Sequence, residues 1–528
     1  METTEYAPVF EENARLKNEN DTLKIEVEEL SAKLAWYEGQ FRLSVAKKYG
    51  PSSEKMQDED QLSFAFNEAE REQRPQAAEP ELEEITYKRK RARRPTGERF
   101  ADLPVETIEY ELEGDGLICE RCDDTLTKMS GEVRKELVIV PATVKVVEHV
   151  QNIYTCAGCR DDVNMDGNVR MARAPEPVIP HSFVSPSLLA YIIDNKYSQA
   201  LPLHRQAGQW KYFGVDIPKQ NMANWVIKGS ALLERIYKPL KERLLKERYI
   251  HADESPMQVL SEPGRKATAK SYMWVYCTGE KAIRRIYLYE YQPSRSGKHP
   301  KEFLEGFAGV LQTDALDSYN MVENAERLGC LAHFQRHFVD ALKTLPKDAD
   351  VSRTLAERGR LYCADLFMLE RKYEGMSSGE RFSARIEKTA PLLGEFHAWL
   401  LESEKKALPK SALGKAVKYC LNQWERLMVV LTDGDLEISN NRAERAIRGF
   451  AVGRKNFLFA KSQAGAKASA ICYSIIETAK ANGLSPYHYL KHLFEAIPNL
   501  PVNDAEALEK LLPWSEELPV DCHVKPRQ

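Results

Sequence analysis

Apolar positions near the N-terminus repeat every seven residues. One row holds Leu16, Leu23, Leu30 and Tyr37, and the second row holds Asn13, Asn20, Val27, Leu34 and Phe41. This heptad pattern predicts a coiled coil within residues 1–55, and a polar Asn at a core position fixes the register, usually of a dimer. An amphipathic helix that packs on its own protein is the alternative.

Polar residues dominate the following segment, 56–100, which is rich in Glu, Gln and Asp. Such a composition predicts a flexible linker. The linker contains a basic run, "KRKRARRPTGER", at residues 88–99. This run is either a solvated part of the linker or a contact to a phosphate backbone, because clustered Lys and Arg side chains neutralise phosphates.

Two Cys-x-x-Cys pairs lie within residues 101–165, with strand-like alternation between them. The four cysteines are Cys119 and Cys122 in "CERC" and Cys156 and Cys159 in "CAGC". Four thiolates from two such pairs fit one tetrahedral zinc ion and leave no open position, so we expect a structural Zn²⁺. A redox pair is the alternative, but it needs only one of the two motifs.

Residues 166–246 show helical patterns that Pro202, Gly214 and Pro218 interrupt. These breaks predict short helices of roughly 8–12 residues. The arrangement resembles a helix-turn-helix with residues 219–228 as the reading helix, although any small helical subdomain has a similar pattern. The candidate DNA contacts in this region are Arg205 and Lys219.

The pattern changes to strands near residue 248. "RYIHADESPMQVL" predicts a short strand that ends at Asp253, two further strands follow it, and "AGVLQTDALDSYN" predicts a fourth strand with Asp314 at its end. A fifth strand runs into a helix in "LGCLAHFQRHFVDALKTL". Together they predict a mixed sheet covered by helices. We therefore divide the rest of the chain into a first core part (247–344), a helical insertion (345–430), a second core part (431–482) and a C-terminal region (483–528).

Three acidic side chains are candidate metal ligands. If the first and fourth strands are neighbours, Asp253 and Asp314 converge, and Glu444 adds a third carboxylate from a helix. Such a set fits two hard divalent cations. Each acid has a simpler reading as a turn residue, a helix cap or an ion-pair partner. The nearby competitors are Glu254, Asp317 and Glu437.

Basic residues surround Glu444 in "SNNRAERAIRGFAVGRKNFLF". A site that acts on DNA has phosphates to neutralise, so several of these side chains are expected to hold a DNA strand. The candidates are Asn441, Arg448, Arg454 and Lys455. Arg442 and Arg445 are expected to pair with nearby acids, and Ser439 or Asn440 to cap the helix.

Composition adds few constraints. The 528 residues carry 75 basic and 79 acidic side chains, a net charge of −4, so local patches must support any contact to nucleic acid. No apolar run approaches the ~20 residues of a membrane span. The N-terminus is polar and acidic, so we expect a cytoplasmic chain with reduced cysteines.

The chain resembles the DDE transposases of insertion-sequence family 66 over nearly its whole length. The shared motifs are "YGPSSEK", "CERC…CAGC", "NKYSQALPLHRQ", "HADESPMQVL", "GVLQTDALDSYN", "SNNRAERAIRGFAVGRKNFLFAKS" and "SIIETAKANGLSPYHYL". The block "NNRAERAIR…GRKNFLF" is the most specific of these. Two departures are the missing glycine after the aspartate in "TDALDSYN" and His337, which replaces an expected basic residue.

The resemblance implies a multidomain α+β chain with a ribonuclease-H-like catalytic core and an all-α insertion. Asp253, Asp314 and Glu444 take the places of the family's acids, which bind two Mg²⁺ ions. The implied activity is cleavage at the ends of an insertion sequence and strand transfer into target DNA. Cys330 and His333 match a Cys/His pair of the family, and we expect His333 to be structural or DNA-facing.

The implied partners are the terminal repeats of the element, target DNA and at least one more copy of the chain. Small accessory transposition proteins are further candidates, and the expected location is the nucleoid in a bacterial cytoplasm. Two other functions are open at this point. One is a ribonuclease-H-like DNA nuclease, and the other is a zinc-containing dimeric DNA-binding regulator.

Overall fold

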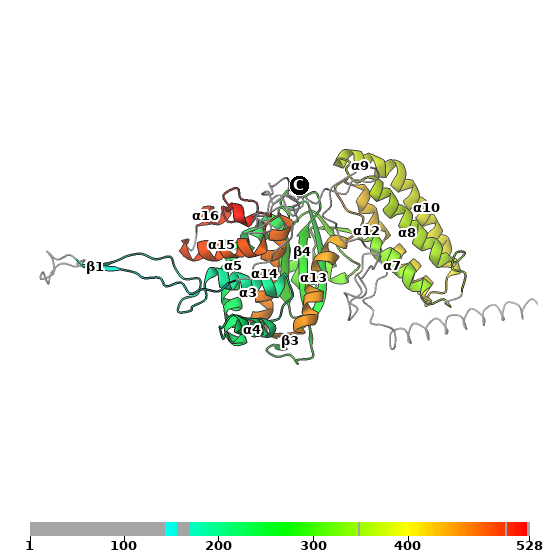
Figure 1. Ribbon diagram of the computed structural model, residues 1–528. Helices are drawn as coiled ribbons and strands as arrows, with labels where there is room; N and C mark the ends of the chain where they lie inside the picture. Colours follow the sequence, from blue (N-terminus) through cyan, green and yellow to red (C-terminus); the bar gives the residue numbers. More distant parts are fainter. Residues whose placement is uncertain (1–142, 156–168, 347–348, 502–503, 525–528) are drawn as a thin grey trace, which may run out of the picture. The chain divides into compact units, whose positions relative to one another are not determined.

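A computed structural model describes residues 143–155, 169–346, 349–501 and 504–524 (Figure 1). The predicted coiled coil, the linker with its basic run and all four cysteines of the predicted zinc site lie outside these residues. A two-stranded antiparallel ribbon, β1 (Ile153–Thr155) and β2 (Val169–Met171), flanks the segment that carries the second cysteine pair. No described helix is long and apolar enough to cross a membrane.

A mixed six-stranded sheet forms the centre of the described chain, as the strand pattern predicts. Its strands are β3 (Tyr249–Ser261), β4 (Lys270–Thr278), β5 (Tyr287–Gln292), β6 (Val310–Gln312), β7 (Glu326–Leu328) and β8 (Ala460–Ser462). The order is β5-β4-β3-β6-β7, and β8 pairs with β3. Strand β4 runs antiparallel to both β3 and β5, whereas β6 runs parallel to β3 and β7 parallel to β6.

Strand β3 does not end at Asp253, as the sequence pattern predicts, but continues to Ser261. The reason is a change of partner on one edge. Residues 249–251 pair with β6, whereas Val259 and Ser261 pair with β8, which follows much later in the chain. On its other edge β3 pairs with β4 from residue 250 to residue 258. Asp253 therefore lies within a central strand, at the point where β6 has ended.

Helices that pack on the sheet or on one another surround the main hydrophobic core. They are α3 (Pro186–Tyr197), α4 (Leu203–Tyr212), α5 (Lys219–Leu244), α6 (Lys298–Phe303), α13 (Asn441–Phe457), α14 (Gln463–Ala481), α15 (Pro486–Ala496) and α16 (Ala505–Glu509). Helix α14 packs on β5 and α5, and α13 packs on β3 and β4 (Figure 1).

Helix α5 differs from the predicted short helices because it runs for 26 residues. Pro239 lies inside it, where a proline removes one backbone hydrogen bond. The apolar side chains on either side of this position, Ile236 and Leu240, are fully buried, and their packing supports the helix through the proline. The proposed reading segment is therefore the first part of a long core helix, with Met222 and Trp225 buried.

Residues 345–430 contain helices and no strand among the described positions (Figure 1). The helices of this part are α8 (Leu355–Lys372), α9 (Ser378–Ala384), α10 (Ala390–Lys406), α11 (Ala412–Asn422) and α12 (Trp424–Met428). They form a second hydrophobic core with α7 (Leu331–Leu342), which follows β7.

Arg385 joins this helical part to the segment that leads into α13. Its guanidinium is fully buried and forms a bidentate ion pair with Glu370 of α8, at 2.8 and 2.7 Å. It also donates to the carbonyl oxygens of Val430, Asp433 and Leu436, at 2.7–3.1 Å. The arginine thereby satisfies three backbone acceptors and fixes the course of the chain just before Glu437.

Candidate active site

Asp253 and Asp314 lie at the same level of two neighbouring parallel strands. The last pair between β3 and β6 joins His251 to Gln312. Asp253 lies on β3 two residues after His251, and Asp314 lies two residues after Gln312, just beyond the end of β6. Because residues two apart in a strand place their side chains on the same face, Asp253 shares a face of β3 with His251.

Glu444 joins these two acids from the first turn of α13, the helix that packs on β3 and β4. Burial raises the pKa of Asp253 well above its usual range, and the negative charges of Glu254, Glu444 and Asp314 raise it further. The three acids predicted from the sequence therefore form one electrostatic cluster, although they lie far apart in the chain.

The three competing acids are engaged in other contacts. Glu254 forms an ion pair with Arg295 and accepts a 2.7 Å hydrogen bond from the Tyr319 hydroxyl. Burial, and then the charge of Asp314, raise the pKa of Glu254 to about 7. Asp317 is exposed and accepts a 3.1 Å hydrogen bond from Asn320.

Glu437, the third competitor, is held by groups that favour its ionised form. Although burial acts in the opposite direction, His251, Arg442 and the backbone N–H of Glu280 lower the pKa of Glu437 to about 2. Its carboxylate lies 3.1 Å from the His251 ring and 3.1 Å from the Arg442 side chain, and Arg442 also pairs with Glu280 at 3.5 Å. The expected pairing of Arg442 with nearby acids is thus present in the structure.

Asn440 connects three elements of the site and is 1% exposed. Its side-chain amide donates to the Ala252 carbonyl oxygen at 2.8 Å, and its side-chain oxygen lies 2.9 Å from Nδ1 of His251. Its backbone N–H donates to the Cys330 sulfur at 3.2 Å. Asn440 occupies the N-cap position of α13, but its side chain makes no capping hydrogen bond, so the predicted cap is wrong for this residue. The side chain bridges to β3 instead.

Two basic side chains of α7 approach Glu444. Arg336 donates to Oε2 of Glu444 at 3.2 Å and lies 3.2 Å from Nε2 of His333, while Nδ1 of His333 lies 3.7 Å from Oε1 of Glu444. Because an arginine only donates, we assign Nε2 of His333 as the acceptor and place the imidazole proton on Nδ1, facing Glu444. Arg336 thus holds one oxygen of the carboxylate, which is 15% exposed, whereas Nδ1 of His333 and Oε1 of Glu444 are buried and make no hydrogen bond within the described chain.

Donor atoms of Cys330, His333 and Glu444 all lie within 4.8 Å of one another, a spacing that a metal ion could bridge. The sequence shows the Cys-x-x-His pair but not its third member, which is more than 100 positions away. Metal binding at Nδ1 of His333 would require its proton to move to Nε2, where Arg336 donates. Because Nδ1 of His333 and Oε1 of Glu444 are buried without a hydrogen-bond partner in the described chain, these three donors form a possible metal site.

The predicted DNA contacts are at the surface. Asn441, Arg448 and Lys455 are exposed on α13, and Arg454 is half-buried in its last turn. Among the described residues, no ion pair involves Arg448 or Arg454. The two contacts predicted outside this helix, Arg205 on α4 and Lys219 at the start of α5, are also exposed.

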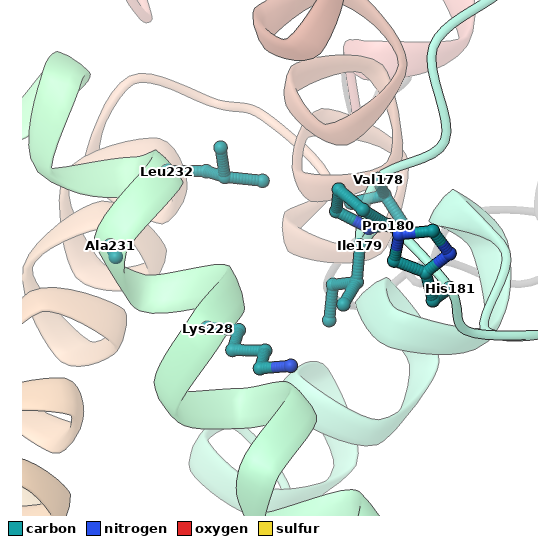
Figure 2. A pocket seen from close by; sticks show the side chains of 7 residues that line it. All are labelled: Val178, Ile179, Pro180, His181, Lys228, Ala231 and Leu232. Carbon is teal, nitrogen blue, oxygen red and sulfur yellow. The ribbon is translucent and has the colours of Figure 1, made fainter.

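A separate hollow lies between α5 and the segment that precedes α3 (Figure 2). It is lined by Val178, Ile179, Pro180, His181, Lys228, Ala231 and Leu232. These residues include no carboxylate, so this part of the described chain offers no oxygen ligands to a hard cation. The acidic cluster is a different site.

Four family models match the chain. A model described as transposase IS66 family covers residues 181–468, and the IS66 C-terminal element covers 474–514. The zinc-finger binding domain of transposase IS66 covers 117–160, the range that holds all four cysteines of the two pairs. A model described as transposase C of IS166 homeodomain covers 36–108.

Several curated proteins of Sinorhizobium fredii (strain NBRC 101917 / NGR234) are similar to the chain. Uncharacterized protein y4qI is 30% identical over 490 residues, which are 88% of this chain and 86% of that protein. Uncharacterized protein y4jD is 28% identical and covers 84% of this chain and 86% of its own length. Uncharacterized protein y4hP is 28% identical over 416 residues, which are 75% of this chain and 73% of that protein.

Proposed function

Because the chain belongs to the IS66 family of transposases, we propose that it binds the ends of its own insertion sequence and catalyses Mg²⁺-dependent strand cleavage and strand transfer. The observation that carries this proposal is the cluster of Asp253, Asp314 and Glu444 beside cationic side chains of α13. The strand order β5-β4-β3-β6-β7, with three antiparallel strands followed by two parallel ones, supports a ribonuclease-H-like core.

The donor set fits hard divalent cations. All three side chains offer carboxylate oxygens, the ligands that Mg²⁺ prefers. Burial raises the pKa of Asp253, and the charges of Glu254, Glu444 and Asp314 raise it further, so a cation bound at Asp253 would favour its ionised form. When bound by these acids, two Mg²⁺ ions activate an oxygen nucleophile and neutralise charge at the scissile phosphate.

The neighbouring residues of the chain hold this arrangement in place. Asn440 joins the start of α13 to β3, and Arg336 holds the Glu444 carboxylate from α7. The cations Arg448 and Arg454 hold phosphates on either side of the reacting one. The acids bind cations and do not attack DNA, so no covalent bond between enzyme and DNA forms.

The N-terminal parts serve assembly and DNA binding. Cys119, Cys122, Cys156 and Cys159 hold a structural Zn²⁺, a proposal that the zinc-finger family match supports. The heptads of residues 1–55 join two copies of the chain, so that both ends of the element are held together. Small accessory proteins are proposed as further partners.

Joining of a pre-cleaved element end tests the function. The purified chain is incubated with a duplex that ends in the free 3′-hydroxyl of the element and with plasmid DNA, with and without Mg²⁺. We expect Mg²⁺-dependent covalent joining of the duplex to the plasmid. Cutting without joining would identify a nuclease, and binding without either reaction would identify a regulator.

A further inference from the structure

We propose that Leu458 and Phe459 form an apolar wedge that inserts between bases of the DNA duplex bound along α13. The wedge rests on the proposed function, since the duplex is the element end that the transposase holds. It adds to that function a local unstacking of the DNA by Leu458 and Phe459. Four independent features of the described chain support it: backbone conformation, exposure, anchoring and charge.

The backbone at Leu458 is in an unfavourable conformation. Its φ is 60° and its ψ is −53°, and the Phe459 N–H donates to the Phe457 carbonyl oxygen at 2.7 Å. These are the features of a γ-turn of the rare, strained type, which a glycine would adopt more easily. Strain of this kind persists where surrounding structure imposes it, and it concentrates at functional sites.

Both side chains at this turn face solvent. Leu458 is 65% exposed and Phe459 is 45% exposed, whereas Phe450, earlier on the same helix, is 1% exposed. Burial of either apolar side chain would be favourable. Neither the strain nor the exposure is therefore explained by packing within the described chain.

Contacts on both sides hold the turn. On the helix side, the Lys196 ammonium lies 4.1 Å from the centre of the Phe457 ring, and the Asn456 side chain donates to the Ala200 carbonyl oxygen at 3.1 Å. On the other side, β8 begins at Ala460 and pairs with β3. The exposed pair thus lies between α13, which carries Glu444, and β8, which pairs with the strand that carries Asp253.

Charge identifies the partner as a polyanion. Residues 445–476 contain no Asp or Glu, and they contain six cationic side chains. These are Arg445, Arg448, Arg454, Lys455, Lys461 and Lys467. Apolar wedges flanked by cations are the means by which proteins unstack base steps while they hold the adjacent phosphates.

The geometry predicts where the unstacking occurs. Leu458 follows Glu444 by 14 residues, so the two lie about 21 Å apart along the helix axis. At about 3.4 Å per base step, this distance corresponds to roughly six steps from the scissile phosphate.

Fluorescence of 2-aminopurine tests the wedge, because this base brightens when it is unstacked. Duplexes with the two terminal sequences of the element that encodes the chain receive one 2-aminopurine each, from the cleavage point to about ten steps away, a range that brackets the predicted position. Binding of the full chain is followed in parallel by mobility shift. We expect a fluorescence maximum near the sixth step.

The variants Leu458→Gly and Phe459→Ala should lose that maximum. Glycine relieves the strained turn, so Leu458→Gly should unfold at the same or a higher temperature than the parent chain. Neither variant removes a phosphate contact, so the slope of affinity against salt should be unchanged. The matched control is Val520→Ala, which removes an apolar side chain that is 86% exposed near the C-terminus and should keep the signal.

A mismatch at the brightened step provides a second readout. The parent chain should bind the mismatched duplex more tightly than the fully paired one, because a mismatched step is easier to unstack. The wedge variants should bind both duplexes equally. Binding by the parent chain without any fluorescence maximum would overturn the wedge and leave the proposed function standing. A maximum that survives in both variants would also overturn it, and a failure of the parent chain to bind would overturn both proposals.

Discussion

The side-chain amide of Asn440 donates a 2.8 Å hydrogen bond to the carbonyl oxygen of Ala252, the residue before Asp253. The backbone carbonyl oxygen of Asn440 in turn accepts the N–H of Glu444 at 3.1 Å. One buried residue therefore bonds both to the strand that carries the first acid and to the turn that carries the third. We regard this bridge as the element that holds Glu444 beside Asp253.

Replacing Asn440 with Ala should affect both stability and cleavage. The change removes the side-chain partner of the Ala252 carbonyl oxygen and of Nδ1 of His251, and each such loss costs about 1–3 kcal/mol. Urea unfolding should show this loss, and cleavage of element ends should fall more than end binding. The adjacent Asn441→Ala is the matched control for stability, because Asn441 is exposed. Its free energy of unfolding should lie within about 0.5 kcal/mol of that of the parent chain. Equal stability of the two variants would contradict the bridge.

Replacing Arg385 with Met should destabilise the chain strongly. The variant leaves Glu370 and three carbonyl oxygens without their buried partner, so we expect a loss of about 3–5 kcal/mol in the free energy of unfolding. The control is Arg360→Met on α8, which removes a partly exposed ion pair with Glu357. It should cost at most about 1 kcal/mol. Similar small losses in both variants would count against the anchoring role of Arg385.

Asp253 should make the metal-free chain less stable as the pH rises. Its folded-state pKa lies above the unfolded-state value, so its stabilising contribution is complete below about pH 4 and is lost as the pH rises through the folded pKa. Between about pH 5.5 and about pH 8, the melting temperature should fall more for the parent chain than for Asp253→Asn. The difference between the two chains cancels titrating groups that do not interact with Asp253.

Magnesium should reverse this effect. A cation that binds the native acids stabilises the folded chain by mass action, so Mg²⁺ should raise the melting temperature of the parent chain near pH 8. The same addition should leave Asp253→Asn almost unchanged. An equal rise in both chains would mean that the cation binds elsewhere.

Arg454→Ala and Arg448→Ala should weaken DNA binding without removing its sequence preference. Each arginine that contacts a phosphate contributes about one to the slope of log affinity against log salt, so each variant should reduce that slope by about one. Lys510→Ala, on an exposed ion pair with Glu517, is the control and should leave the slope as it is. An unchanged slope in both arginine variants would exclude phosphate contacts at these positions.

The sheet and the three acids were within reach of sequence reasoning for physical reasons. Strands have short local periods, and carboxylates that follow apolar strand residues stand out against them. The pairing of β3 with β8 could not be predicted from the sequence, because β8 lies some 200 positions later and has only three residues. The full length of the strand beyond Asp253 could therefore not be predicted.

The contacts that position the acids could not be predicted either. Asn440 and Ala252 are 188 positions apart, and Arg336 and Glu444 are 108 positions apart. Local sequence favours a capping role for an Asn before a helix, and only the packing of α13 on β3 redirects its side chain. The length of α5 was likewise decided by tertiary packing, which outweighs the local effect of Pro239.

The most direct test of the account is strand cleavage at the element ends by the parent chain and by Glu444→Gln, measured with Mg²⁺ under conditions in which both chains bind the DNA equally. Glu444→Gln keeps the size of the side chain and removes the negative charge that would hold the cation. We expect cleavage by the parent chain and a cleavage rate about 100-fold or more lower in the variant, the scale of metal-site defects. Undiminished cleavage by Glu444→Gln would contradict the account.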